Sequence, residues 1–238
     1  MADDAIGDSD KSRAWSGVSA LRYAVLATLA VSAVLIAIPA FDRSVSGSFY
    51  TPGTGFGGKP GSLVNIVRWT GIYVNWLAVA AFIAAWAAKL LPNVQWQGVT
   101  WANLKFLTAA TLLGPGLVVN GILKSFWGRA RPIQTDWFGG TWPYSAPWLP
   151  VDHCSRNCSF VSGEASASFC LLALAFVAPP AWRRAVAIAA LLFALAIGWA
   201  RIAAGGHYFS DVVIAFGLTL IAILAARWWF PEELDARP

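Results

Sequence analysis

Two residues near the end of the chain, His207 and Asp211, have the types and spacing of a nucleophile and its orienting group. They are four residues apart, so on a helix they share a face one turn apart. Asp211 can then bind one imidazole nitrogen, fix the tautomer and leave the other nitrogen free to attack. Arg201 precedes them, and Gly205-Gly206 allows the backbone to approach a ligand closely. The alternative interpretation is a packed, hydrogen-bonded histidine without a chemical role.

A pair of basic residues, Lys124 and Arg131, forms a second cluster in the segment KSFWGRARP at 124–132. They are seven residues apart, and on a continuing helix they would share a face two turns apart. The planar fork of arginine suits phosphate oxygens, and lysine supplies a point charge. The alternative is that both are interfacial anchors that contact lipid headgroups.

The third cluster, Ser162-Gly163-Glu164, precedes an apolar run. A helix that begins here leaves backbone N–H groups unpaired, and an anion can bind them. Ser162 is also a good N-cap residue, and Glu164 would be favoured by the positive end of the helix dipole. However, a carboxylate so close to an apolar run is costly unless it has a role.

The three clusters together contain the parts that phosphoryl transfer requires. They provide cations for the phosphate, a helix start that binds anions and an oriented nucleophile. The combination predicts phosphate chemistry with His207 as the nucleophile.

The elements that position these clusters are predicted to be membrane helices. Of the 238 residues 58% are hydrophobic and only 12% are charged, and 14 are tryptophan, which favours the headgroup level of a bilayer. Six apolar runs are long enough, or nearly so, to cross a membrane: Leu21–Phe41, Gly71–Leu91, Leu104–Leu123, Phe160–Val177, Ala185–Ala200 and Phe209–Phe230. We therefore expect an all-α polytopic bundle at 21–230, with a polar cytoplasmic tail at 1–20 and a C-terminal tail at 231–238. Gly114-Pro115-Gly116 predicts a kink in the third helix.

Charge and topology limit the possible partners. The net charge of +5 comes from basic residues scattered between apolar runs, so a nucleic-acid partner is not expected. Six crossings place both ends of the chain on one side. With Lys124, Arg131 and Arg201 set aside as substrate ligands, the positive-inside rule favours cytoplasmic ends. The three clusters would then face the outside, while the oligomeric state stays open.

The clusters resemble the motifs of the type 2 phosphatidic acid phosphatases (PAP2), KxxxxxxRP, PSGH and SRxxxxxHxxxD. This chain has KSFWGRARP at 124–132, VSGE at 161–164 and ARIAAGGHYFSD at 200–211. The resemblance implies a metal-free lipid phosphatase without a cofactor, in which His207 forms a phosphohistidine and Asp211 orients it. The residues that would hold the phosphate are Lys124, Arg131, Ser162, Gly163 and Arg201.

The chain departs from the family pattern at two positions. Ala200 stands where the family usually has serine, which is a minor change. Glu164 stands where the second histidine of the family protonates the leaving alkoxide. Glu164 can serve as the general acid if burial and the substrate phosphate favour its protonated form. His153, the other histidine of the chain, is the alternative acid.

The flanking segments are similar to those of bacterial lipid A 4′-phosphatases. They are GPGLVVN at 114–120, WGRARP at 127–132, C-x-x-x-CSFVSGEAS at 154–166 and GGHYFSDVV at 205–213. This resemblance implies a periplasm-facing enzyme of a Gram-negative inner membrane. Undecaprenyl diphosphate, phosphatidylglycerophosphate and phosphatidic acid are alternative substrates, and phosphoryl transfer to a second lipid is an alternative reaction. A non-enzymatic membrane-binding protein with a decayed site is the alternative of another class.

Cys154 and Cys158 lie in the loop before the fourth apolar run. In an oxidising compartment they could form a disulfide that fixes the loop. Two free thiols are the alternative, because a four-residue spacing on a helix is unfavourable for a disulfide. With His153 they supply only three metal ligands at an unfamiliar spacing, so no metal site is expected.

Overall fold

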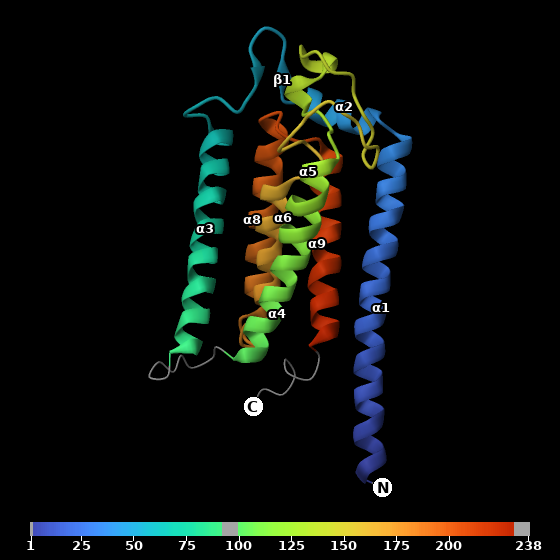
Figure 1. The fold of residues 1–238 in the computed structure, drawn as a ribbon, viewed down its shortest axis with the longest axis vertical. Coiled ribbons are helices and arrows are strands. Elements are labelled where there is room, and N and C mark those ends of the chain that lie inside the picture. The colour runs from blue at the N-terminus through green and yellow to red at the C-terminus, as the bar shows by residue number, and fades with distance from the viewer. Residues whose placement is uncertain (1, 92–99, 231–238) are drawn as a thin grey trace.

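The protein is a bundle of long helices, with loops at one end (Figure 1). The computed structural model describes residues 2–91 and 100–230. Five of its helices are long and apolar enough to cross a membrane: Gly17–Ala37, Leu63–Leu90, Trp101–Phe126, Arg183–Ala203 and Phe209–Trp229. The prediction of an all-α membrane bundle is confirmed. The remaining predicted crossing, the fourth along the chain at Phe160–Val177, is a shorter apolar helix, Gly163–Val177. The tail predicted at 231–238 lies outside the described residues.

The first part of the chain forms two crossings and the connection between them. Helix α1 (Ala2–Ala37) includes most of the segment predicted as a polar tail. It leads into α2 (Ala40–Gly47) and a short antiparallel hairpin of β1 (Tyr50–Thr51) and β2 (Gly55–Phe56). Helix α3 (Leu63–Leu90) returns across the membrane, and its N-cap Ser62 accepts a hydrogen bond from the backbone N–H of Asn65.

The third crossing changes its helical type midway. It consists of α4 (Trp101–Thr111), the π-helix η1 (Leu112–Leu123) and α5 (Lys124–Phe126). Pro115 lies inside η1 and has no N–H to donate to the preceding turn. The side-chain amide of Asn120 donates to the carbonyl of Pro115 at 2.6 Å. The irregularity expected at Gly114-Pro115-Gly116 is therefore a π-helical segment, a form often found at functional sites.

The fourth crossing is short because its first residues are not helical. The 127–162 loop contains two 3-10 turns, η2 (Pro132–Gln134) and η3 (Asp136–Phe138). The crossing itself is divided into α6 (Gly163–Cys170), η4 (Leu171–Ala173) and α7 (Leu174–Val177). At 1.5 Å per residue, Gly163–Val177 spans about 22 Å, less than a hydrocarbon core of about 30 Å. The preceding Phe160 and Val161 are buried in the bundle as irregular chain.

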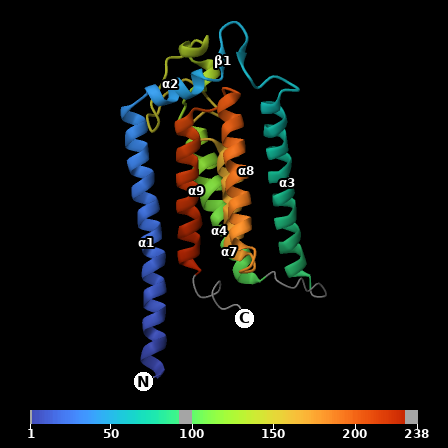
Figure 2. The same cartoon turned by 180° about the vertical axis from the view of Figure 1, so that it is seen from behind.

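Helix α9 (Phe209–Trp229) is the central helix of the bundle, and α3 is a peripheral one (Figures 1 and 2). α9 packs against α1, α4, η1 and α6. A Cβ atom at Gly217 would lie 2.6 Å from the hydroxyl of Thr28, so this glycine permits the close contact of α9 with α1. α3 packs mainly against α8 (Arg183–Ala203), where Gly71 contacts Ile197.

The loops gather at one end of the bundle. α2, the hairpin and the 127–162 loop lie together there, at what we call the loop end (Figure 1). Helix α1 begins and α9 ends at the opposite end (Figure 2). The turn between α8 and α9 is at the loop end, and Gly205 adopts a φ of +65° in it, packed against Phe56 of the hairpin. The loop end therefore collects the three polar clusters.

Candidate active site

The histidine predicted as the nucleophile lies buried between α8 and α9. His207 is only 1% exposed, and its Nδ1 is 2.7 Å from the backbone carbonyl oxygen of Ser159. Because a carbonyl oxygen only accepts, Nδ1 carries the proton and donates it. Nε2 then holds the lone pair, and it has no hydrogen-bond partner within residues 2–91 and 100–230. Burial lowers the pKa of His207 to about 4, so the ring is neutral near pH 7.

Asp211 orients the histidine together with Ser159, a residue that the sequence analysis missed. Its Oδ2 is 3.8 Å from Nδ1 of His207, beyond a direct hydrogen bond. The same oxygen accepts from the hydroxyl of Ser159 at 2.5 Å and from the backbone N–H of Tyr208 at 2.9 Å. The carboxylate of Asp211 therefore fixes Ser159, whose carbonyl fixes the imidazole. Ser159 directly follows Cys158, and no spacing rule connects it to His207.

Asp211 belongs to a buried network of ion pairs and hydrogen bonds centred on Arg129. The fully buried guanidinium of Arg129 donates to Asp211 at 2.6 Å and to Asp42 of α2 at 2.9 Å. Asp42 also accepts from the backbone and hydroxyl of Ser210 and from the hydroxyl of Tyr144. The two carboxylates outweigh the effect of burial and raise the pKa of Arg129. Arg129 was overlooked in the sequence because the seven-residue spacing singles out its neighbours Lys124 and Arg131.

Two tyrosines next to this network, Tyr144 and Tyr208, have pKa values shifted by burial. The guanidinium of Arg129 lies 4.3 Å from the ring centroid of Tyr208 and 5.3 Å from that of Tyr144. Burial raises the pKa of both tyrosine hydroxyls, so both stay protonated. The hydroxyl of Tyr144 is therefore a donor to Asp42, and the network links α2, the 127–162 loop and α9.

Two of the cations predicted to bind phosphate, Arg201 and Lys124, lie close enough to His207 to act on its imidazole electrostatically, and Arg131 lies near Lys124. Arg201 is 4% exposed, and its guanidinium lies against Gly206, where a Cβ would come within 2.5 Å of a terminal nitrogen. A Cβ at Gly163 would lie 3.2 Å from Nζ of Lys124. Arg131 donates through Nη2 to the backbone carbonyl of Asn157 at 2.8 Å. Burial lowers the pKa of Arg131, while the nearby carboxylate of Glu164 acts in the opposite direction.

Ser162 and Gly163 occupy the start of α6, as expected. Ser162 is the N-cap, and its hydroxyl accepts from the backbone N–H of Ala165 at 3.4 Å. Its own backbone N–H donates to the carbonyl of Asp211. The side chain of Ser162 is thus committed to the helix, as in the capping interpretation. A Cβ at Gly163 would lie 2.5 Å from Oδ1 of Asn120, so only glycine fits beside Asn120 and Lys124.

Glu164 is held by arginines from two other helices. Both of its carboxylate oxygens accept from Arg68 of α3, at 3.3 Å and 3.2 Å. Oε1 is also 3.6 Å from Nε of Arg201. Two guanidinium groups stabilise the carboxylate form. Arg68 was not recognised in the sequence as a site residue, because it is a lone basic residue at the start of an apolar run.

The alternative acid, His153, has a different environment. Its ring stacks on Trp142 with centroids 5.0 Å apart, and its backbone N–H donates to Gly128. These contacts hold His153 within the fold of the loop, whereas Glu164 contacts Arg201 beside the nucleophile.

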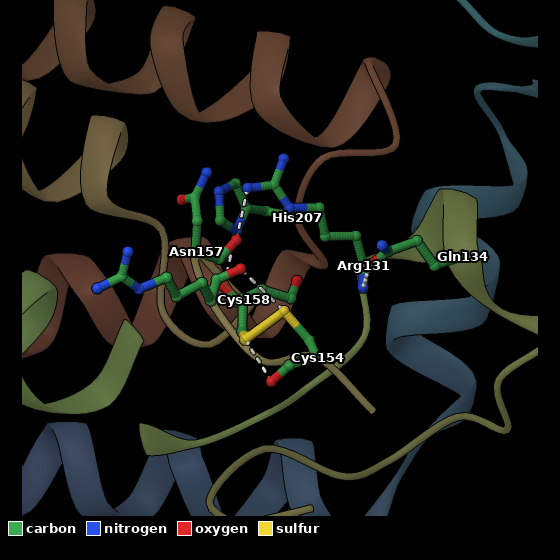
Figure 3. The surroundings of a disulfide bond; sticks show 8 residues. Arg131, Gln134, Cys154, Asn157, Cys158 and His207 are labelled. Carbon is green, nitrogen blue, oxygen red and sulfur yellow. Dashed lines mark hydrogen bonds between the residues drawn. A yellow bond between two sulfur atoms is a disulfide. The ribbon is translucent and has the colours of Figure 1, made fainter. Parts of the chain in front are cut away.

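A disulfide joins Cys154 and Cys158 in an irregular segment, with Cα atoms 5.6 Å apart. The unfavourable geometry expected for a helix does not apply there. The bonded loop contains Asn157, whose carbonyl holds Arg131, and it ends beside Ser159, whose carbonyl holds His207. Figure 3 shows the disulfide next to Arg131 and His207. In the described part of the chain, no group of three or more His, Cys, Asp or Glu residues is placed to bind a metal.

A cavity leads from the site into the apolar part of the bundle. It has a volume of about 270 Å³ and lies between α3, the third crossing and α6. Lys124, Gly163 and Glu164 line it, and apolar α3 side chains such as Ile72 and Trp76 form its wall. The fold and the site thus define a helical membrane protein with a cluster of cations near a histidine nitrogen that has no hydrogen-bond partner in the described part of the chain.

Comparison with known proteins identifies the family. The PAP2 superfamily matches residues 104–235, more than half of the chain, and the protein belongs to this superfamily. The lipid A 4′-phosphatase of Rhizobium leguminosarum is 38% identical over 152 residues, 62% of this chain and 64% of that protein. The lipid A 4′-phosphatase of Francisella tularensis subsp. novicida (strain U112) is 40% identical over 109 residues, 45% of this chain and 49% of that protein. The matches thus span about half to under two thirds of these relatives' length.

A solved structure has the same fold. The transmembrane PAP2-type phosphatidylglycerolphosphate phosphatase from Bacillus subtilis is similar with a TM-score of 0.58. The similarity covers 92% of this chain and 98% of the other, at 20% sequence identity. It therefore includes the first crossings, which lie outside the matched family region.

Proposed function

We propose that the protein is a metal-independent lipid phosphatase whose substrate is the 4′-phosphate of lipid A. The observation that carries the proposal is Nε2 of His207, which has no hydrogen-bond partner among the described residues and lies near Lys124 and Arg201. The 270 Å³ cavity supports a lipid substrate, because its polar end lies at the cations and its wall is apolar. The similarity to lipid A 4′-phosphatases supports the choice of lipid.

In the proposed reaction, Nε2 of His207 attacks phosphorus and the bond to the lipid oxygen breaks. The three cations and the Gly163 amide stabilise the phosphoryl oxygens. Glu164, protonated in the substrate complex, donates its proton to the leaving alkoxide, and His153 is the alternative donor. Water then attacks the phosphohistidine and gives up a proton to Glu164, which restores the free imidazole and releases phosphate.

The proposed setting is the inner membrane of a Gram-negative bacterium, with the loop end in the periplasm. The disulfide at the loop end supports this orientation, because such bonds persist in oxidising compartments. The 4′-phosphate would reach His207 from the outer leaflet through the cavity beside α3.

The test is phosphate release in EDTA by the purified protein from lipid A and from a panel of lipids. The panel contains undecaprenyl diphosphate, phosphatidylglycerophosphate and phosphatidic acid. Loss of only the 4′-phosphate from lipid A is expected. Turnover of another lipid instead would reject lipid A, and phosphate that appears only on an added acceptor lipid would indicate phosphoryl transfer. No turnover of any lipid would favour a non-enzymatic binding protein.

Two histidine variants provide matched controls for the chemistry. His207→Ala should lower the rate by at least about a thousandfold, since removal of a nucleophile is among the most severe changes. His153→Ala should keep most of the activity, and Glu164→Gln should lose it, if Glu164 is the acid. The reverse pattern would assign the acid to His153. An active His207→Ala variant would refute the mechanism.

A further inference from the structure

The position of the Arg68–Glu164 ion pair is unusual because the pair lies inside the anion site. Glu164 is the second residue of α6, directly after Gly163 and beside Lys124. Arg68 reaches it from the first turns of α3, with two hydrogen bonds from one guanidinium. This is the fork geometry in which arginine binds a carboxylate or a phosphate.

One carboxylate oxygen of Glu164 lies between the guanidinium groups of Arg68 and Arg201. Oε1 of Glu164 lies 3.2 Å from Nη2 of Arg68 and 3.6 Å from Nε of Arg201. Nε of Arg201 has no hydrogen bond within the described residues, although Arg201 is 96% buried. An oxygen that moved slightly toward Arg201 would satisfy this buried donor.

The charges around this place do not balance without a further anion. Arg68, Lys124, Arg131 and Arg201 carry four positive charges, while His207 is neutral and Glu164 supplies one negative charge. Arg129, Asp42 and Asp211 together add one further negative charge on the Nδ1 side of the imidazole, which leaves two positive charges without a partner. A phosphate monoester dianion would supply the missing negative charge, and each of its oxygens can accept from an arginine fork.

Arg68 is partly exposed, which leaves its side chain room to change partners. Its side chain is 33% exposed, and α3 is the peripheral helix that forms the wall of the cavity. Arg201 is fixed between Gly206 and α6, and Arg131 is fixed by Asn157. A small movement of the Arg68 side chain, which lies one helical turn before the cavity-lining Ile72, would exchange one anionic partner for another.

We propose that Arg68 is a fourth phosphate ligand, which Glu164 holds in the substrate-free protein and which passes to the substrate phosphate on binding. This inference rests on the proposed phosphatase function. Glu164 acts as an internal competitor for the anion site. Transfer of Arg68 to the phosphate leaves Glu164 without its bidentate partner and beside a new negative charge, which favours uptake of the proton that it donates to the leaving group.

Binding of inorganic phosphate separates this role from a purely structural ion pair. If the pair only holds α3 against α6, loss of either partner disturbs the site and weakens phosphate binding, and Arg68→Lys, which keeps the charge without the fork, should bind phosphate as the wild type does. Under the proposal the two directions are opposite. Arg68→Gln should weaken binding by about tenfold or more, the effect of one charge-assisted contact. Glu164→Gln should tighten it several-fold, because the competing carboxylate is gone.

The experiment is a calorimetric titration of purified protein with inorganic phosphate at pH 7. Arg68→Lys should bind phosphate with an affinity between the wild-type and Arg68→Gln values. Arg43→Gln, which removes an exposed arginine at the same end of the bundle, is the control for net charge and should leave the affinity unchanged. Melting temperatures of all variants identify any that are misfolded.

Two results would overturn the inference. One is an unchanged phosphate affinity in Arg68→Gln, and the other is weaker binding in both Arg68→Gln and Glu164→Gln. Neither depends on turnover, so failure of the wild-type protein to hydrolyse lipid phosphates would reject the proposed function separately. In that case opposite affinity changes would still establish Arg68 as an anion ligand.

Discussion

At the residue scale, the chemistry of His207 depends on which ring nitrogen carries the proton. The Ser159 carbonyl accepts a hydrogen bond from Nδ1–H of His207. The Asp211 carboxylate accepts one from the Ser159 hydroxyl and so holds Ser159 in place. The proton is thus placed on Nδ1 by a main-chain group, which no side-chain substitution removes directly. This arrangement directs the lone pair of Nε2 toward the cations.

The buried position of His207 predicts an unusual pH dependence. Because burial lowers the pKa of His207 to about 4, protonation of the free enzyme starts well below the ordinary value of 6.5. The nucleophile should therefore stay neutral from pH 7 down to about pH 5, and activity should be lost only as the pH falls toward 4. The measurement is kcat/KM for phosphate release between pH 4 and 8, because kcat/KM reports the ionisation of the substrate-free protein.

The substrate also titrates in this range, since the second pKa of a phosphate monoester is about 6. The ionisation of the substrate phosphate is measured from its ³¹P chemical shift in the detergent micelles used for the assay. The measured fraction of dianion is then used to correct the rates. An acid limb near pH 6.5 that persists after this correction would contradict the environment described for His207.

At the element scale, a buried guanidinium bridges the carboxylates of α2 and α9, which are also joined directly by the hydrogen bonds from Ser210 to Asp42. Arg129 pairs with Asp42 and Asp211, which are far apart in the sequence. Removal of one member of a buried ion pair typically costs about 3–5 kcal/mol, since the partner is left without compensation. We expect Arg129→Gln to lower the free energy of unfolding by about that amount, as measured by urea or thermal unfolding in detergent.

A matched substitution tests the cause. Asp42→Asn removes one carboxylate but leaves Arg129 paired with Asp211, so it should be less destabilising than Arg129→Gln. Adding Asp42→Asn to Arg129→Gln should recover part of the stability, because one fewer unpaired carboxylate stays buried. Simple additivity of the two losses would show that the network is not coupled.

The disulfide loop is a second element that acts on the site. It positions the Asn157 carbonyl, which accepts from Arg131. Substitution of both Cys154 and Cys158 by serine should raise KM about fivefold, the effect of one hydrogen bond of about 1 kcal/mol, with a smaller change in kcat. Steady-state kinetics with and without a thiol reductant provide the measurement.

The double serine variant should not respond to the reductant, and the wild type should approach it under reduction. Cys170 is the free cysteine among the described residues and is buried in α6, so it provides the thiol that both proteins share. A reductant effect that persists in the double variant would assign the effect to another part of the protein.

The sequence predicts the crossings and the three motifs, because each depends on local composition or on spacing within about a dozen residues. It does not predict Arg68, Asp42 or Ser159. Their partners are 96 residues away for Arg68, 87 for Asp42 and 48 for Ser159. The sequence also leaves the roles of Ser162 and Glu164 open, because a cap and a phosphate ligand require the same residue types at a helix start.

At the scale of the whole molecule, the ends of α3 should be accessible from opposite sides of the membrane. Lys59 precedes α3 at the loop end, and Lys89 lies in its last turn. In spheroplasts, a membrane-impermeant maleimide should label Lys59→Cys directly. Lys89→Cys should be labelled only after the membrane is permeabilised. The opposite pattern would place the site in the cytoplasm.

The short fourth crossing has a consequence for how the protein finds its substrate. Because Gly163–Val177 covers only about 22 Å, we expect the start of α6 and the proposed phosphate site to lie below the level that a full crossing would reach. The lipid would then reach the proposed site by lateral diffusion within its leaflet, so the encounter is a two-dimensional one. In mixed micelles the rate should follow the mole fraction of lipid in the surface, and dilution with inert detergent should slow it at constant bulk concentration. Short soluble phosphate esters, which do not partition into the surface, should be turned over slowly.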